Sequence, residues 1–122
     1  MAGARHFDEL DCWQLANELK LAILEIAERP RVARDFKFCG QFVDAAAGAP
    51  RTIAEGFGRR SDADFAKFLD YARGSLMECQ NHLADAADRR YIDATERDRL
   101  IVLAKRAGGA AASLQRHLRR KK

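Results

Sequence analysis

The stretch between Ser61 and Arg89 constrains this chain most, because its apolar residues form a strict heptad seam. They recur at alternating steps of four and three, as Phe65, Leu69, Ala72, Leu76, Cys79, Leu83 and Ala86. This spacing places all of them on one face of a long helix and is typical of left-handed helix packing. Ser61 is predicted to cap the helix, with Asp64 at the capping-box position three residues later.

Three further segments also have helical periodicity. They cover about 8–28, about 35–57, and a last segment that begins with Asp93 as N-cap and Glu96 at the capping-box position. No segment shows the alternation of a strand, and the short connections predict antiparallel neighbours. The sequence therefore predicts an all-α protein with one domain, 1–122, folded as an antiparallel up-down-up-down four-helix bundle that oligomerises.

Proline and glycine interrupt the predicted helices. Pro50 removes a backbone hydrogen bond inside the segment 35–57 and is expected to kink it. Gly56 is expected to end that helix as a C′ residue in the left-handed conformation. Gly74, in the middle of the heptad segment, is expected to permit the close approach of another helix.

Positive charge is concentrated at the C-terminus. The chain holds 22 basic and 18 acidic residues, whereas residues 1–115 hold 17 basic and 18 acidic residues and sum to −1. We expect a basic tail, 116–122, whose weak and non-specific binding to nucleic acid uses Arg116, Arg119, Arg120, Lys121 and Lys122. No apolar run approaches the ~18 residues of a membrane span, and no signal peptide is evident, so we expect a cytoplasmic protein without membrane contact.

The connection after Glu55 leaves two interpretations open. In the first, backbone N–H groups at the start of the next helix face a phosphate. The residues of this anion site would be Gly56, Gly58, Arg59, Arg60 and Ser61. In the second, the connection is a turn that Glu55 holds by pairing with Arg59 or Arg73. A role for Glu55 as general acid or base lacks a second catalytic group at a suitable spacing.

The spacing of the remaining reactive side chains gives little support to catalytic or metal chemistry. Glu78, His82 and Asp85 share one helix face, but the paired Glu-x-x-His motif of dinuclear iron bundles is absent. We therefore expect no enzymatic activity, no metal and no other cofactor. No CxxC pair occurs, and we expect three small buried hydrophobes at Cys12, Cys39 and Cys79.

A specific motif lies between Pro50 and Glu78. It consists of I-A-E-G at 53–56, G-R at 58–59, Ser61, D-F-A-K-F-L at 64–69 and A-R-G-S-L-M-E at 72–78. In these residues and their spacing, the chain resembles the four-helix bundle protein family, also called the 23S ribosomal-RNA intervening-sequence proteins. The structural residues of the motif are Glu55, Gly56, Gly58, Ser61, Arg73, Gly74, Ser75 and Glu78. Arg73 and Glu78 are expected to make paired contacts within the bundle or across a subunit interface.

The resemblance implies a small bacterial homopentamer, sometimes encoded within an insertion in the large ribosomal RNA gene. The family is similar to the accessory variability protein of diversity-generating retroelements, whose pentameric barrel binds nucleic acid and a reverse transcriptase. This chain departs from the family pattern in two places. Gly48 and Thr52 replace a serine and an asparagine, and residues 42–44 replace arginines that many members carry after the glutamine matching Gln41.

Two functional hypotheses remain open. One is a non-enzymatic oligomeric binding module for RNA or a ribonucleoprotein, which the resemblance and the basic C-terminus favour. The other is an assembly scaffold for a partner protein with no direct nucleic-acid role, which the near-neutral body and the small-residue helix faces favour. In both, Phe68 and Tyr71 beside the heptad seam are surplus apolar residues of the kind expected at an interface.

Overall fold

The computed structural model describes residues 3–120, and helices form nearly all of this range. In chain order they are the 3₁₀-helix η1 (Phe7–Glu9) and the α-helices α1 (Asp11–Ala27), α2 (Pro30–Ala33), α3 (Phe36–Phe57), α4 (Asp62–Asp88) and α5 (Ala94–Arg120). No strand occurs between residues 3 and 120, so the predicted all-α class is confirmed. The short helix α2, with Pro30 at its first position, was not predicted and occupies the connection after α1.

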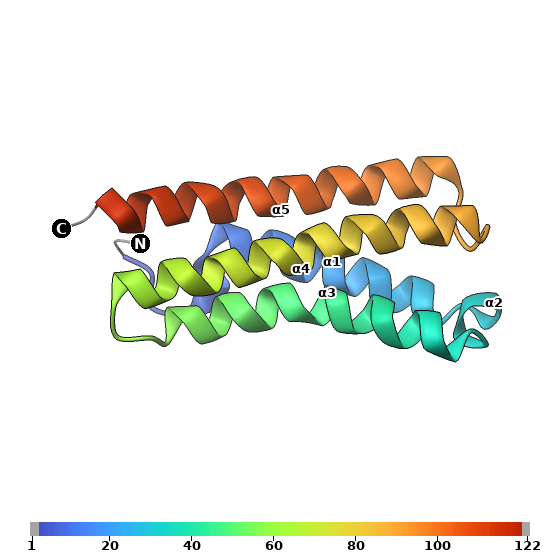
Figure 1. The fold of residues 1–122 in the computed structure, drawn as a ribbon, viewed down its shortest axis with the longest axis horizontal. Coiled ribbons are helices and arrows are strands. Elements are labelled where there is room, and N and C mark those ends of the chain that lie inside the picture. The colour runs from blue at the N-terminus through green and yellow to red at the C-terminus, as the bar shows by residue number, and fades with distance from the viewer. Residues whose placement is uncertain (1–2, 121–122) are drawn as a thin grey trace.

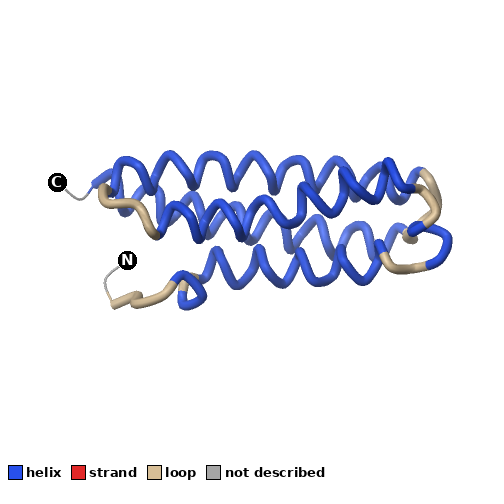
Figure 2. The backbone as a smooth tube through the Cα atoms, turned by 90° about the horizontal axis from the view of Figure 1, so that it is seen from below, coloured by secondary structure: helices blue, strands red, loops and turns tan. Residues whose placement is uncertain are grey.

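The four long helices α1, α3, α4 and α5 lie side by side (Figure 1). Helix α4 packs against α3 and α5, and α1 packs against the same two helices from the other side. The connections gather at the two ends of the molecule, as the view turned by 90° also shows (Figure 2). One end holds η1, the α3–α4 connection and the end of α5, and the other end holds α2 and the α4–α5 connection (Figure 1).

A single apolar core fills the space between the long helices. All seven residues of the heptad seam in α4 are buried, as predicted. The side chains that meet them include Leu19 and Ile23 of α1, Phe42 and Ile53 of α3, and Leu100 of α5, and each of these is at most 1% exposed. Burying large aliphatic and aromatic side chains supplies about 1.5–3 kcal/mol each, so this core is the main source of stability.

Two of the three cysteines, Cys12 and Cys79, are the buried hydrophobes that the sequence predicts, whereas Cys39 is not fully buried. Cys12 and Cys79 are buried, and burial raises the pKa of their thiols to about 11 and about 12, respectively. Both thiols are therefore protonated near neutral pH and pack as small hydrophobes. Cys39 is half-buried and donates its S–H group to the carbonyl of Val32, 3.1 Å away.

Both predicted N-caps are confirmed. The backbone N–H of Asp64 donates to Ser61 Oγ over 3.1 Å, and the N–H of Glu96 donates to Asp93 Oδ1 over 2.8 Å. Each cap satisfies a backbone donor that the first turn of a helix leaves unpaired. These local contacts explain why the starts of α4 and α5 were predictable to the residue.

Gly56 does not end α3, and its predicted C′ role is wrong. Helix α3 continues through Pro50 and Gly56 to Phe57, and its C-cap is Gly58 with an ordinary φ of −80°. Among residues 3–120, the only glycine with positive φ is Gly3. Glycine is needed at position 56 for a different reason, because an ideal Cβ there would lie 2.7 Å from Phe68 Cβ of α4.

The close helix approach predicted at Gly74 therefore occurs at Gly56 instead. A Cβ at Gly74 would meet nothing within 4 Å in the described chain, and Gly74 is exposed. A second close contact between α3 and α4 lies at Gly48, where a Cβ would come within 2.8 Å of Ser75 Oγ. The absence of a side chain at Gly56 thus permits the short distance between α3 and α4, whereas the Ser75 hydroxyl beside Gly48 can rotate.

Asp35 is the most heavily hydrogen-bonded carboxylate at the α2 end of the molecule. It caps α3 by accepting from the N–H of Phe38, and it also accepts from Tyr91 Oη over 2.7 Å and Arg89 Nη1 over 3.1 Å. These contacts, the Tyr91 hydrogen bond first, hold the pKa of the Asp35 carboxyl below its usual value of 3.8. They tie the start of α3 to the α4–α5 connection.

Two arginines likewise join the α2 region to the α4–α5 connection and the first turn of α5. Arg29 donates to both carboxylate oxygens of Glu96, over 3.0 and 2.8 Å, and also to Glu25. Arg31 donates to the carbonyl of Arg90 over 2.9 Å. Because Arg29 is only partly exposed and binds Glu96 in a bidentate manner, this pair is geometrically more specific than a simple surface ion pair.

We predict that Gly56→Ala destabilises the protein by about 1–3 kcal/mol, because the added methyl group overlaps Phe68 of α4. Gly58→Ala is expected to cost less, since a Cβ there makes only an ordinary contact, 3.5 Å from the Glu55 carbonyl oxygen. Gly40→Ala, in an open and exposed position of α3, is expected to stabilise by about 0.5–1 kcal/mol. Urea unfolding of the three variants checks this order, and a Gly56→Ala variant as stable as its parent contradicts it.

We predict that Asp35 stabilises the protein only while its carboxyl is ionised. Because the folded state lowers its pKa, this stabilisation is present above the usual value of 3.8 and is lost as the pH falls through the folded value. Asp35→Asn should therefore be less stable than its parent at pH 6, and the difference should shrink below pH 3.8. Denaturant unfolding across this range is the measurement. Asp44→Asn, at an exposed carboxylate with no hydrogen bond or ion pair to the described chain, is the control, and an equal pH dependence for both variants contradicts the prediction.

Candidate nucleic-acid interface

The predicted basic tail is largely part of a helix. Helix α5 extends to Arg120, and Leu118 within the last turns is only 2% exposed. Residues 116–120 therefore pack onto the body of the protein and do not form a separate tail. Lys121 and Lys122, which belong to the same prediction, lie outside the described residues.

Exposed cations line the outer side of α5 in its first half and again in its last turns. The exposed positions 99, 102, 106, 109, 113, 116 and 120 follow one another at alternating steps of three and four and so share one helix face. We call this side of the helix, together with the adjoining exposed Lys105, the α5 outer face. Its cations are Arg99, Lys105 and Arg106 in the first half of the helix, and Arg116 and Arg120 in the last turns. At 1.5 Å per residue the face is about 30 Å long.

Most cations of the α5 outer face are unpaired. Arg99 comes within 3.9 Å of Glu96, whereas Lys105, Arg106, Arg116 and Arg120 form no ion pair within residues 3–120. Helix α5 as a whole holds seven basic and two acidic residues, a net charge of +5. Its neighbour α4 holds two basic and six acidic residues, a net charge of −4. The positive charge of the body is thus concentrated on one helix, where it can attract a polyanion.

Lys105 and Arg106 were not identified from the sequence as candidate nucleic-acid-binding residues. The prediction counted charge by segments along the chain, and residues 1–115 appeared neutral by that count. The helical spacing of Arg99, Arg106 and Arg116 was the available indication, because these positions fall on the side of α5 opposite its buried residues.

Arg119 differs from the other C-terminal cations because it belongs to a polar cluster between α4 and α5. Its Nη2 lies 3.3 Å from Asp70 Oδ2. The buried side chain of Gln115 donates to Asp70 Oδ1 over 2.6 Å and to the carbonyl of Ala66 over 2.8 Å, and it accepts from Arg73 over 3.0 Å. The Gln115 hydrogen bond first, and then Arg119, lower the pKa of Asp70. These contacts fix the rotation of α5 about its axis, and with it the direction of the outer face.

The α3–α4 connection lies at the same end of the molecule as the last turns of α5 (Figure 1). Arg59 pairs with Glu55 over 3.2 Å, as the turn interpretation predicted, and its guanidinium lies 4.4 Å from the centre of the Phe68 ring. Arg60 is exposed and forms no ion pair with residues 3–120. The start of α4 is a poor anion site, because Ser61 already caps it and Asp62 and Asp64 stand in its first turn.

The remaining residues of the sequence motif are dispersed over the surface of α4. Arg73 contacts Gln115, and not Glu55, while Ser75 packs beside Gly48 and Gly74 is open. Glu78 is exposed and makes no ion pair with Arg73. A pairing of Arg73 with Glu78 inside the bundle is therefore not formed.

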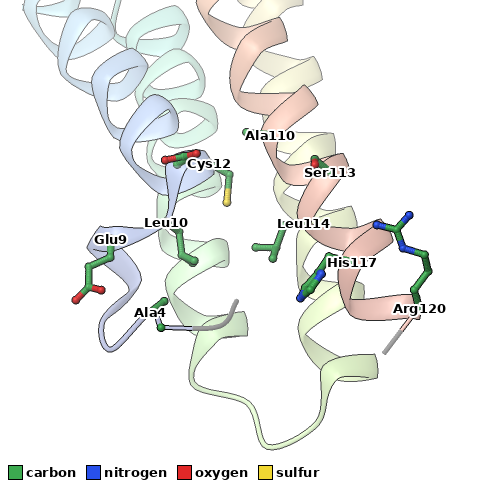
Figure 3. A pocket seen from close by; sticks show the side chains of 11 residues that line it. Ala4, Glu9, Leu10, Cys12, Ala110, Ser113, Leu114, His117 and Arg120 are labelled. Carbon is green, nitrogen blue, oxygen red and sulfur yellow. The ribbon is translucent and has the colours of Figure 1, made fainter. Parts of the chain in front are cut away.

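A cavity of about 730 Å³ opens between the start of α1 and the last turns of α5 (Figure 3). Leu10, Cys12 and Leu114 form its apolar wall, and His117 and Arg120 stand on its α5 side. The thiol of Cys12 points toward this space, but its raised pKa keeps it protonated and therefore a poor nucleophile. The Cys12 thiol that faces the cavity is therefore not activated as a nucleophile.

Two of the three residues considered for metal binding, His82 and Asp85, serve other contacts. The ring of His82 lies edge-on to Phe38 and Phe42, and Asp85 pairs with Arg89 over 3.1 Å. Within residues 3–120, no group of three or more His, Cys, Asp or Glu side chains is arranged to hold a metal ion. In the same range, no helix has the length and apolarity that crossing a membrane requires.

Comparison with known proteins identifies the family. The family model for the 23S rRNA-intervening sequence protein matches residues 8–111, and the chain therefore belongs to this family. No curated protein matches the chain. The matched range includes Lys105 and Arg106 of the α5 outer face and ends before Arg116 and Arg120.

Proposed function

We propose that this member of the 23S rRNA-intervening sequence protein family is a non-enzymatic, oligomeric helical-bundle protein that associates with RNA. The observation that carries the proposal is the α5 outer face, which presents exposed and largely unpaired cations on a stable helix. Such a face can follow the phosphates of a polynucleotide without reading its bases. Because the family description refers to ribosomal RNA, we propose RNA as the polyanion that binds this face.

The proposed working form is an antiparallel up-down-up-down four-helix bundle assembled into a homopentamer. Five copies would present five α5 outer faces, and multivalency would raise the avidity of individually weak contacts. The proposed subunit interface is the outward side of α4, where Tyr71 and Met77 are 53% and 63% exposed and Gly74 lies between them. Association with RNA would place the protein in the cytoplasm.

The alternative is an assembly scaffold that binds a partner protein and has no direct role with nucleic acid. A groove between α4 and α5 favours it, with a volume of about 480 Å³ and with Gly74, Gly108 and Gly109 in its walls. A Cβ at any of these three glycines would meet nothing within 4 Å, so the groove has room for a helix from another chain.

We predict that the double variant Arg106→Gln/Arg116→Gln binds a single-stranded RNA, dodecauridine, about tenfold more weakly than the parent. The slope of log affinity against log salt should also become shallower by about 1.4, since two phosphate contacts are lost. The matched control is Arg51→Gln/Lys67→Gln, which removes two exposed and unpaired cations from α3 and α4. Fluorescence anisotropy at several salt concentrations is the measurement.

Substitution is preferable to truncation in this test, because ending the chain at Gln115 would also remove the buried Leu118. Equal losses in both double variants would contradict a site on the α5 outer face and indicate only a general dependence on net charge. A parent protein that binds no dodecauridine at low salt would overturn the RNA proposal and leave the scaffold alternative.

We predict a native mass of about 68 kDa, five times the 13.7 kDa chain, by light scattering. Met77→Lys should lower this mass, because a charge would enter the proposed α4 interface. Val102→Lys, at a similarly exposed position of the α5 outer face, is the control and should leave the mass unchanged. A parent mass of 13.7 kDa would contradict the assembly, and an unchanged mass for Met77→Lys would exclude this interface.

A further inference from the structure

Phe36 is the most exposed large apolar side chain among residues 3–120, with 84% of its surface accessible. It is the first residue of α3 and lies at the α2 end of the molecule, away from the last turns of α5 (Figure 1). A single exposed apolar residue is ordinary on a protein surface. Phe36 is different because of the rigidity and the charge of its surroundings.

The backbone that carries Phe36 is firmly held. Its neighbour Asp35 accepts hydrogen bonds from Phe38 N–H, Tyr91 and Arg89, and two residues later Phe38 packs in the core. On the other side, Val32 of α2 is buried and accepts the Cys39 thiol hydrogen bond. The backbone position of Phe36 is therefore fixed by an ordered scaffold, so that a partner stacking on the ring need not order this segment of the chain.

Cations surround Phe36 in the sequence. Residues 29–37 hold Arg29, Arg31, Arg34 and Lys37 against one acid, Asp35, a net charge of +3. Arg34 and Lys37 are exposed and form no ion pair with residues 3–120, and the carboxylate of Asp35 is already engaged by Arg89 and Tyr91. The free charge next to the exposed ring is thus positive.

We propose that Phe36 stacks on an unpaired base of single-stranded RNA, while Arg34 and Lys37 contact the flanking phosphates. An exposed ring between free cations matches a polyanion with accessible aromatic faces, which a single strand offers and a paired duplex does not. Phe36 and the start of α5 lie at the same end of the molecule, the α2 end (Figure 1), although α3 and α5 are separated by α1 and α4. The inference rests on the proposed association with RNA and names the kind of RNA.

The test uses the full-length protein and three probes: dodecauridine, a 12-base-pair RNA duplex and inorganic polyphosphate. Phe36→Ala should weaken the binding of dodecauridine about tenfold and leave the affinities for duplex and polyphosphate unchanged. Phe36→Trp should restore the affinity, and dodecauridine, but not polyphosphate, should quench its added fluorescence. Leu21→Ala removes another exposed apolar side chain, 56% accessible, and should change none of the affinities.

Four results would overturn the proposal. One is a Phe36→Ala variant that binds dodecauridine as tightly as the parent, while Arg106→Gln/Arg116→Gln binds it more weakly; RNA association would then stand without stacking at Phe36. Another is an equal loss for all three probes, and a third is a lower native mass of Phe36→Ala, which would assign the ring to a contact between copies of the chain. A parent that binds none of the RNA probes would overturn both this inference and the proposed function.

Discussion

The packing of α4 between α3 and α5 is the constraint on which the rest of the structure depends. Its heptad seam is buried along the whole helix, and α3 approaches it so closely that a methyl group at Gly56 would overlap Phe68. Once α4 is placed, the contacts of Gln115 with Ala66 and Asp70 fix how α5 is rotated against it. The direction of the basic outer face is therefore a consequence of packing, and not of the charges themselves.

The two polar clusters at the ends of α4 differ in what they hold. Near its start, Gln115 and Asp70 form a partly buried connection that orders the last turns of α5, where the chain would otherwise fray. At its other end, Asp35 and Arg29 link two connections that are distant in the sequence, over 54–67 residues. Both ends of the molecule are thus fixed by side chains from different helices, which is the condition for presenting Arg120 or Phe36 in a defined position.

The sequence predicted the features that depend on local pattern and failed where the outcome depended on a neighbouring helix. The seam of α4 and the caps Ser61 and Asp93 follow from spacing and from hydrogen bonds within three residues, and they were predicted correctly. Gly56 and Gly58 stand two residues apart, and only the position of Phe68 in α4 shows which one is needed for a close approach. Residues 116–122 were misjudged as a tail because their five cations were counted as a separate segment, although Leu118 keeps the spacing of the buried residues of α5.

The same reasoning applies to the candidate site. A count of charge along the chain found Arg116–Arg120 but treated the preceding part of α5 as neutral, since the acidic residues of α4 cancelled Lys105 and Arg106 in the sum. In the folded protein the acidic residues of α4 and the basic residues of α5 lie on different surfaces, because each helix exposes its own outer side. Phe36 was not considered as a site residue, although its spacing from the buried Phe38 and Phe42 places it on the opposite side of α3.

The separation of charge also bears on how assembly and RNA association could coexist. Helix α4 has a net charge of −4 and would repel a polynucleotide, whereas α5 has a net charge of +5 and would attract it. If the outward side of α4 contacts another subunit, as proposed, the acidic helix is withdrawn from the accessible surface and the α5 outer face remains open. Desolvating α4 carboxylates at such a contact has a cost, which nearby cations from the next subunit would need to offset. Assembly would then strengthen the attraction of RNA without adding a basic residue, because the subunit contact would cover the acidic helix α4, which repels RNA.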